Sequence, residues 1–185
     1  MKTILICNQK GGVGKSLVAD EIAFSFERSG IPMSFYDLDA QGGTLHKTHE
    51  VDGAEVAVVD TPGALQEALA DWLKEADVVV IPTRTTSRDI EPLMRMRKAV
   101  FKHGRAKIVY VMNGWNRFKA SRDFMEWFGG LAGDQTVVTL PQSEAFVQAG
   151  AGEQSVVEYD RRGKAAKATL SMVNTVREIA GFPTE

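Results

Sequence analysis

Short apolar runs rich in β-branched residues alternate along the chain with longer segments in which apolar residues return at steps of three and four. The short runs predict buried strands, and the longer segments predict amphipathic helices. The expected strands cover residues 3–8, 33–39, 56–60, 78–82, 108–113 and 136–140. The expected helices cover residues 15–28, 64–75, 89–102, 121–128 and 164–179. This alternation predicts an α/β fold, in which a mostly parallel, twisted sheet carries helices on both faces.

Several of the expected strands end in Asn, Asp or Pro. Ligands of open α/β sheets bind beyond the carboxyl ends of the strands, so these polar ends are where we expect function. Residues 41–53 contain three glycines and no apolar periodicity, which indicates a loop. We find no repeat, low-complexity tract or linker, and therefore expect one domain over residues 1–185.

The composition of the chain narrows the class of protein. Apolar residues make up 44% and charged residues 25%, which excludes the signature of a disordered chain. A single cysteine, Cys7, excludes an internal disulfide and makes the cytoplasm the default location. The formal net charge of −2 gives no overall attraction to nucleic acid or anionic lipid, so any such binding must come from a local patch.

A glycine-rich segment with the sequence QKGGVGKS joins the first expected strand to the first expected helix at residues 9–16. Glycines let backbone N–H groups curl around anionic oxygens, and a helix N-terminus adds partial positive charge. Lys15 would then reach the β and γ phosphates of a nucleotide, and the Ser16 hydroxyl would ligate Mg²⁺. A bland helix-capping turn is the alternative, but it does not require Gly-Lys-Ser after an apolar strand. The residues expected to bind nucleotide in this segment are Gly11, Gly12, Val13, Gly14, Lys15, Ser16 and Leu17.

The strict P-loop pattern fails by one residue, because its first glycine would fall at Gln9, and an additional lysine stands at Lys10. The segment KGGVGKS at residues 10–16 resembles the deviant Walker A box of the ParA/MinD ATPases. Two more segments follow in the order found in that family: DLDAQGG at residues 37–43 resembles its Asp-x-Asp-Pro-Gln-Gly box, and VAVVDTPG at residues 56–63 resembles its Walker B and switch segment. The resemblance covers most of the chain and implies a P-loop NTPase fold with ATP and Mg²⁺ as cofactors.

Two aspartates at strand ends are candidates for the chemistry. Asp60 ends an apolar strand, where its carboxylate can hold the Mg²⁺ hydration shell opposite Ser16; a plain strand-ending turn is the alternative. Asp39 ends the second expected strand, and the resemblance implies that it orients the attacking water. From the residues alone, a solvated carboxylate at that strand end is an equally good interpretation of Asp39.

The resemblance also implies roles for residues outside the phosphate loop. Lys10 would reach the nucleotide of the facing subunit, so that ATP bridges a homodimer and slow hydrolysis resets the switch. Asn113 and the backbone near Pro141 would hold the adenine. Residues 41–53 are shorter than the corresponding segment of the family, and Ala40 replaces its usual proline, which leaves the partner and the dimer geometry open.

Basic residues gather on the expected helix 89–102 and at its exit. Such a patch could neutralise DNA phosphates without reading sequence, although a solvated helix face is the common alternative. The last residues, 176–183, break at Gly and Pro and are too short for an amphipathic membrane anchor, so we expect no membrane partner. His46 and His49 lie in the loop without a clear third ligand, and Mg²⁺ is the one metal we expect. The candidate DNA contacts are Arg95, Arg97, Lys98, Lys102 and Arg105.

The resemblance is greatest to the small ParA-type partition proteins. It implies an ATPase that dimerises on ATP, binds DNA nonspecifically, is stimulated by a centromere-binding, ParB-like protein and segregates plasmid or chromosomal DNA on the nucleoid. The alternative is a positioning or regulatory scaffold that uses the same switch to recruit a protein cargo without touching DNA. A synthetase that phosphorylates a small carboxylate would use the same fold, but the chain shows no dedicated substrate motif for it.

Overall fold

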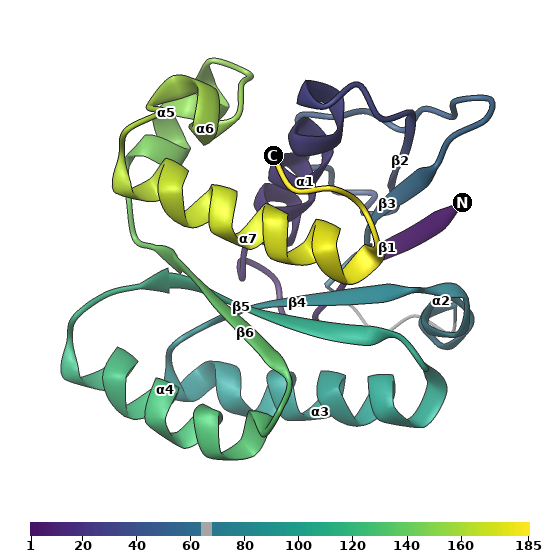
Figure 1. Cartoon of the computed structure of the whole chain (residues 1–185). Helices are drawn as coiled ribbons and strands as arrows, with labels where there is room; N and C mark the ends of the chain where they lie inside the picture. The colour runs from purple at the N-terminus through teal and green to yellow at the C-terminus, as the bar shows by residue number, and fades with distance from the viewer. Residues whose placement is uncertain (64–67) are drawn as a thin grey trace.

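A parallel sheet of six strands forms the centre of the protein (Figure 1). The computed structural model describes residues 1–63 and 68–185. The strand order across the sheet is β2-β3-β1-β4-β5-β6, and every neighbouring pair is parallel. The strands are β1 (Lys2–Ile6), β2 (Met33–Asp37), β3 (Val56–Asp60), β4 (Val78–Arg84), β5 (Lys107–Trp115) and β6 (Thr136–Pro141).

Helices cover both faces of this sheet. One face carries α1 and α7, and the other carries α2, α3 and α4 (Figure 1). The helices are α1 (Lys15–Arg28), α2 (Leu69–Glu75), α3 (Ser87–His103), α4 (Lys119–Ala132), α5 (Ala145–Ala151), α6 (Val156–Tyr159) and α7 (Lys164–Ala180). This arrangement confirms the expected α/β fold. None of the described helices combines the length and the apolar character needed to cross a membrane.

Alternation along β1 divides the core between the two faces. Ile4 and Ile6 pack with α1 and α7, whereas Leu5 and Cys7 pack with α2, α3 and α4. All four side chains are at most 1% exposed. Burial raises the pKa of the Cys7 thiol to about 12, which keeps it protonated and unreactive.

The expected element boundaries need several corrections. β1 and β2 end two residues earlier than expected, and β4 continues beyond Pro82 to Arg84. A proline is tolerated there because the carbonyl of Pro82 faces the β1 side of β4, where it accepts from the Asn8 amide. β1 pairs with β4 only as far as Val80, so the missing N–H of the proline has no ladder partner to lose.

Two short helices, α5 and α6, were not predicted, because one has seven residues with an internal glycine and the other has four. α4 also runs through Gly129 and Gly130 to Ala132, where helix propensity predicted an end at Phe128. Ala132 is buried in the core, and this packing extends the helix. The first part of the expected helix 64–75, residues 64–67, lies outside the described residues.

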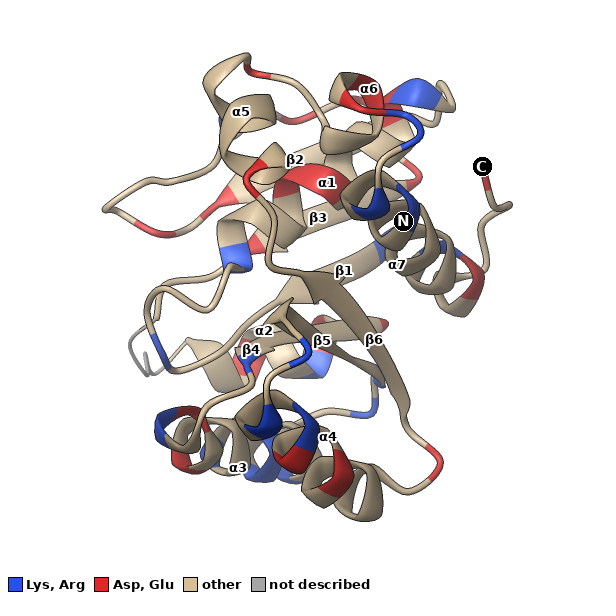
Figure 2. Cartoon of the chain, turned by 90° about the vertical axis from the view of Figure 1, so that its left-hand side faces the viewer, with Lys and Arg blue, Asp and Glu red and all other residues tan. Residues whose placement is uncertain are grey.

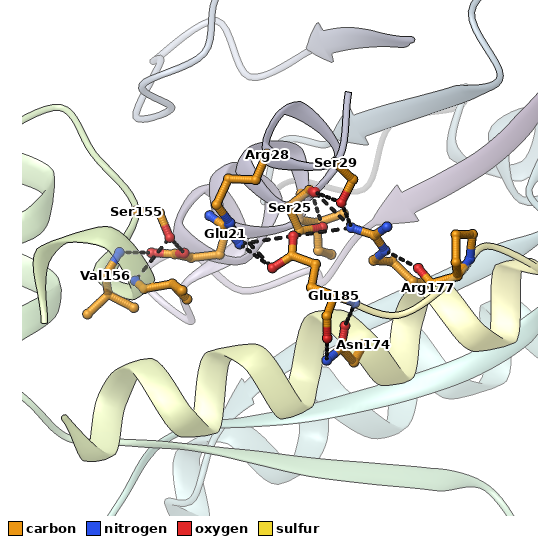
Figure 3. A network of polar contacts seen from close by, with 12 residues as sticks. Glu21, Ser25, Arg28, Ser29, Ser155, Val156, Asn174, Arg177 and Glu185 are labelled. Carbon is orange, nitrogen blue, oxygen red and sulfur yellow. Dashed lines mark hydrogen bonds and ion pairs between the residues drawn. The ribbon is translucent and has the colours of Figure 1, made fainter. Parts of the chain in front are cut away.

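Polar side chains of α1 hold the segments that surround it (Figure 3). Glu21 accepts hydrogen bonds from the Ser155 hydroxyl at 2.5 Å and from the Val156 amide at 2.8 Å, which fixes the start of α6. The buried guanidinium of Arg177 on α7 donates to the Ser25 carbonyl at 2.7 Å. Because α1 begins at the glycine-rich segment, these contacts connect that segment to the C-terminal third of the chain.

Candidate functional site

The glycine-rich segment between β1 and α1 has a backbone that only glycine fits at one key position. Gly14 is the N-cap of α1 and has φ of 96°, in the left-handed region. A Cβ atom on Gly14 would lie 2.1 Å from the Asn113 amide nitrogen, which donates to the Val13 carbonyl at 2.9 Å. On the other side, the buried Asn8 side chain accepts from the Lys10 amide at 3.3 Å. Side chains from β5 and from the end of β1 therefore brace the loop.

A cleft of about 610 Å³ opens over this loop at the carboxyl ends of the strands. Three segments that are far apart in the sequence form its walls, as the strand-end argument predicts. It is large enough for a small-molecule ligand. The lining residues are Gly11, Gly12, Gly14, Lys15, Ser16, Leu17, Asp39, Ala40, Gln41, Gly42, Pro62 and Gly63.

Ser16 and Asp60 form a pair of oxygen donors at the cleft. The Ser16 hydroxyl donates to Oδ2 of Asp60 at 2.8 Å, and Asp60 is fully buried. The second carboxylate oxygen, Oδ1, is also buried and has no hydrogen-bond partner among the described residues. Hydroxyl and carboxylate oxygens are the ligands that Mg²⁺ takes in nucleotide sites, so these residues fit the ion.

Burial is the main cause that raises the pKa of Asp60 to about 6, and the charges of Asp37 and Asp20 raise it further. The hydrogen bond from Ser16 and the charge of Lys15 oppose this rise. A buried carboxylate with a raised pKa and one free oxygen is costly when ionised, and a bound cation would relieve that cost. The electrostatics of the site therefore also fit a divalent cation.

The two lysines of the loop lie differently. Lys15 is 7% exposed, lines the cleft, and its ammonium is 3.5 Å from the Lys10 carbonyl. Lys10 does not belong to the cleft lining; its Nζ donates to Oδ1 of Asp89 at 2.7 Å and to the Arg88 carbonyl at 3.2 Å. Both acceptors lie in the first turn of α3, and the Asp89 side chain is only 1% exposed.

A proline explains why the Arg88 carbonyl is available to Lys10. In a helix this carbonyl would accept from the amide four residues later, but that residue is Pro92, which has no N–H. The Lys10 ammonium takes the place of the missing donor. Its second acceptor, Asp89, also receives a hydrogen bond from the Thr86 hydroxyl. The Arg88 carbonyl and the Asp89 carboxylate thus form a binding position for the Lys10 ammonium, which we call the seat of Lys10.

Asp39 stands in a turn that Asp37 organises. Asp37 accepts from the Asp39 amide at 3.0 Å through Oδ1 and from the Thr44 hydroxyl at 2.5 Å through Oδ2. Asp39 in turn accepts from the Gln41 amide at 3.0 Å. These contacts hold the Asp39 side chain in the lining of the same cleft as the phosphate loop.

The structure therefore brings most of the predicted site residues to one cleft. The predicted residues that do not line it are Lys10, Val13, Asp60, Asn113 and Pro141. Asp60 is fully buried and adjoins the cleft through its hydrogen bond from Ser16. Asn113 contacts the phosphate loop through Val13, and Pro141 pairs with Trp115 at the end of β5. The sequence interpretation missed Asn8 and Asp89. Pro92 inside a helix is the one local signal that pointed to an unsatisfied carbonyl near Asp89.

A glycine-rich loop between the first strand and its helix, a serine hydroxyl bonded to a buried aspartate and a cleft at the strand ends define a P-loop nucleotide-binding protein. The sequence model of the CobQ/CobB/MinD/ParA nucleotide binding domain matches residues 4–156. The chain belongs to this family.

Two relatives are named ParA and IncC. The ParA protein of Rhizobium radiobacter is 27% identical over 115 residues, which cover 48% of this chain and 51% of that protein. The IncC protein of Escherichia coli is 48% identical over 46 residues, which cover 25% of this chain and 13% of that protein. The matched regions thus span about half of the first relative and a small part of the second.

Solved structures of the same fold match nearly the whole chain. A Cyanothece McdA variant in complex with ATP aligns with a TM-score of 0.83 at 15% identity, over 100% of this chain and 98% of that one. MinD of Pyrococcus horikoshii in complex with Mg-ADP aligns with a TM-score of 0.74 at 17% identity, over 97% of each chain. A Borrelia burgdorferi B31 plasmid partition protein bound to AMPPNP aligns with a TM-score of 0.68 at 16% identity, over 92% and 99%. These likenesses show an α/β P-loop NTPase fold.

Proposed function

We propose that the chain is a ParA-like partition ATPase, which binds ATP with Mg²⁺, forms a homodimer around the nucleotide and hydrolyses it slowly. One observation carries the proposal. The phosphate loop with Lys15 and the Asp39 turn line a single cleft, and the Ser16 hydroxyl, which lines it too, donates to the buried Asp60 carboxylate.

Each group has a defined task in this proposal. The loop amides and Lys15 bind the phosphates, and Asp39 orients the attacking water. Ser16 and Asp60 hold Mg²⁺, which supplies positive charge against the phosphate oxygens. Asn113 supports the nucleotide indirectly, since its amide braces the loop at Val13. The adenine contacts proposed for Asn113 and Pro141 lie beyond the cleft described above.

Lys10 is the residue that would couple ATP to dimerisation. The Lys10 ammonium lies outside the cleft and donates to the first turn of α3. This position suits a side chain that contacts the nucleotide of a facing subunit rather than the nucleotide of its own subunit. About a third of the Lys10 side chain is exposed, so it can leave Asp89 without opening the core. Supplying a cation across the interface would stabilise the charge that develops during phosphoryl transfer.

Nonspecific DNA binding would use the solvent face of α3, where lysine and arginine positions recur (Figure 2). Lys98, Lys102 and Arg105 are exposed and make no ion pair with any residue that the structure describes. Arg95 is tied to Glu91, and Arg97 donates to the Leu131 carbonyl at 3.1 Å. The first three residues are therefore the better phosphate contacts of the predicted set.

Sedimentation velocity tests the proposal. The wild type, Lys10→Ala and the matched surface control Lys47→Ala are compared with ADP, ATP and a nonhydrolysable ATP analogue, with and without random duplex DNA. We expect ATP-specific dimers of the wild type and of Lys47→Ala, and monomers of Lys10→Ala. Monomers of the wild type under every condition would refute the dimerisation switch.

The same experiment distinguishes a positioning or regulatory scaffold, which would recruit a protein cargo without DNA. Charge reversal at Lys98, Lys102 and Arg105 would abolish cosedimentation with DNA if the chain is a partition ATPase. ATP-dependent dimers that ignore DNA at low salt would favour the scaffold instead. A ParB-like partner would accelerate ATP hydrolysis in the first case, and its stimulation would depend on the same dimer.

A further inference from the structure

We propose that His46 and Asp20 form a latch that positions the Asp39 turn over the phosphate site, and that both act as positioning residues for ATP hydrolysis. The inference deepens the proposed function and rests on it. The latch joins α1, which carries Asp20, to the loop that carries His46.

The contact itself is short and buried. Nδ1 of His46 lies 2.7 Å from Oδ1 of Asp20, and the two side chains are only 7% and 6% exposed. Asp20 also accepts from the backbone amides of Leu45 and His46 at 2.9 Å and 3.0 Å. The Asp20 carboxylate thus accepts three hydrogen bonds from residues 45 and 46. Water would satisfy these donors in a solvated loop, so the three bonds fix the loop on α1.

The ring of His46 is fixed by packing as well as by its hydrogen bond. It lies edge-on to Phe24 at a centroid distance of 4.4 Å and stacks on Phe35 at 5.1 Å. Nε2 approaches the carboxylate of Glu27 at 3.4 Å. Burial lowers the pKa of His46, but the hydrogen bond and charge of Asp20, together with Glu27, outweigh burial and leave the pKa above its usual value. Each ring nitrogen of His46 thus lies close to a carboxylate of α1.

The Thr44 hydroxyl lies between the latch segment and the Asp39 turn. Its single proton is shared between two acceptors, the His46 carbonyl at 2.9 Å and Oδ2 of Asp37 at 2.5 Å. Asp37 accepts the Asp39 amide at 3.0 Å through its other oxygen. Moving His46 away from α1 would release Thr44, and with it the carboxylate that shapes the turn.

The latch also sets the distance between the segment and the Mg²⁺ ligands. A Cβ atom on Gly43 would lie 3.2 Å from the Ser16 hydroxyl, so the segment passes directly over the start of α1. Asp20 is four residues beyond Ser16 on the same helix. One rigid helical turn therefore fixes the position of the Asp39 turn relative to the loop that binds the phosphates. Attack by water requires such a fixed arrangement of the reacting groups.

Steady-state ATP hydrolysis tests this inference with three variants. His46→Phe keeps the ring between Phe24 and Phe35 but cannot donate to Asp20, and His46→Asn restores a donor near the position of Nδ1. His49→Phe is the matched control, because the His49 side chain is exposed and, among the described residues, hydrogen-bonds to the Lys47 carbonyl and not to α1. We expect kcat of His46→Phe to fall roughly tenfold or more with KM for ATP within about twofold, because displaced catalytic groups slow the chemistry more than they weaken binding.

Rescue separates positioning from a general loss of structure. His46→Asn should recover most of kcat, and His49→Phe should match the wild type. Equal rates for His46→Phe and the wild type would overturn the latch, as would an equal loss in His46→Phe and His46→Asn.

Hydrogen exchange makes the latch testable apart from hydrolysis. If the wild type did not hydrolyse ATP, the proposed function would fail, yet the latch would still predict slow exchange at the Leu45 and His46 amides. His46→Phe should raise the exchange rate of both amides at least tenfold, and His49→Phe should leave it unchanged. Identical exchange in the wild type and His46→Phe would refute the latch whatever the activity.

Discussion

Ionisation of Asp60 should destabilise the nucleotide-free protein, and the free energy of unfolding measured as a function of pH should show this loss. Its folded pKa of about 6 lies above the ordinary value of 3.8, chiefly because of burial. A raised carboxyl pKa means that the folded state binds the proton more tightly than the unfolded state. The stability contributed by protonated Asp60 is present in full below its unfolded pKa and is lost as pH rises through about 6.

The size of the effect follows from the shift. A change of this size corresponds to about 3 kcal/mol over the full titration, of which roughly 2 kcal/mol falls between about pH 4.5 and about pH 7.5. Asp60→Asn removes the titration while the amide oxygen can still accept from Ser16. Urea unfolding of both proteins across this pH range, without nucleotide, cancels the contributions of all other groups.

We expect the stability of the wild type relative to Asp60→Asn to fall by roughly 2 kcal/mol as pH rises over this range. Mg²⁺ with ADP should reverse the trend, because the ion binds the ionised carboxylate and its stabilisation grows with pH. A stability difference between the two proteins that stays constant with pH would refute the assignment of a raised pKa to Asp60. Equal Mg²⁺-dependent stabilisation of both proteins would refute the metal role.

Three further substitutions test contacts at and around the site. Asp89→Asn weakens the seat of Lys10, so half-maximal dimerisation should need roughly fivefold less ATP, equivalent to about 1 kcal/mol; an unchanged midpoint in sedimentation experiments would show that the seat costs nothing. Gly14→Ala forces a Cβ into the left-handed region and against Asn113, and should weaken Mg-ADP binding at least tenfold in calorimetry, with roughly 2 kcal/mol lost on unfolding. Arg177→Met removes the donor of the Pro183 carbonyl and one of the donors of the Ser25 carbonyl, and should cost roughly 3 kcal/mol in urea unfolding. A loss below about 1 kcal/mol would contradict the network in Figure 3.

The phosphate loop could be predicted from the sequence because its requirements are local. Glycine spacing, Lys15 and Ser16 act within one turn of chain, and the preceding apolar strand gives the context. The placement of Asp39 just beyond β2 and of Asp60 at the end of β3 followed from the parallel α/β pattern, since such a sheet gathers its carboxyl ends at one edge. Those four side chains do line or adjoin one cleft.

Contacts between distant segments could not be predicted in this way. Lys10 and Asp89 are 79 residues apart, and their meeting depends on how α3 packs beside β1. From the sequence, His46 is weak evidence for a metal site. Its partner in the structure is Asp20, which lies on the buried face of α1 among apolar residues. A carboxylate on such a face is the signal that the periodicity argument passed over, because periodicity measures burial and does not identify the partner.

The latch and the Figure 3 network give α1 a role beyond covering the sheet. Asp20 holds the Asp39 turn, Glu21 holds the start of α6, and Ser25 holds Arg177 of α7. All three residues follow the phosphate loop on one rigid helix, so a displacement at its N-terminus must move each attachment together or strain it. A displacement caused by phosphate binding at the loop would therefore pass first along α1, and Asp20 would transmit it to residues 41–53.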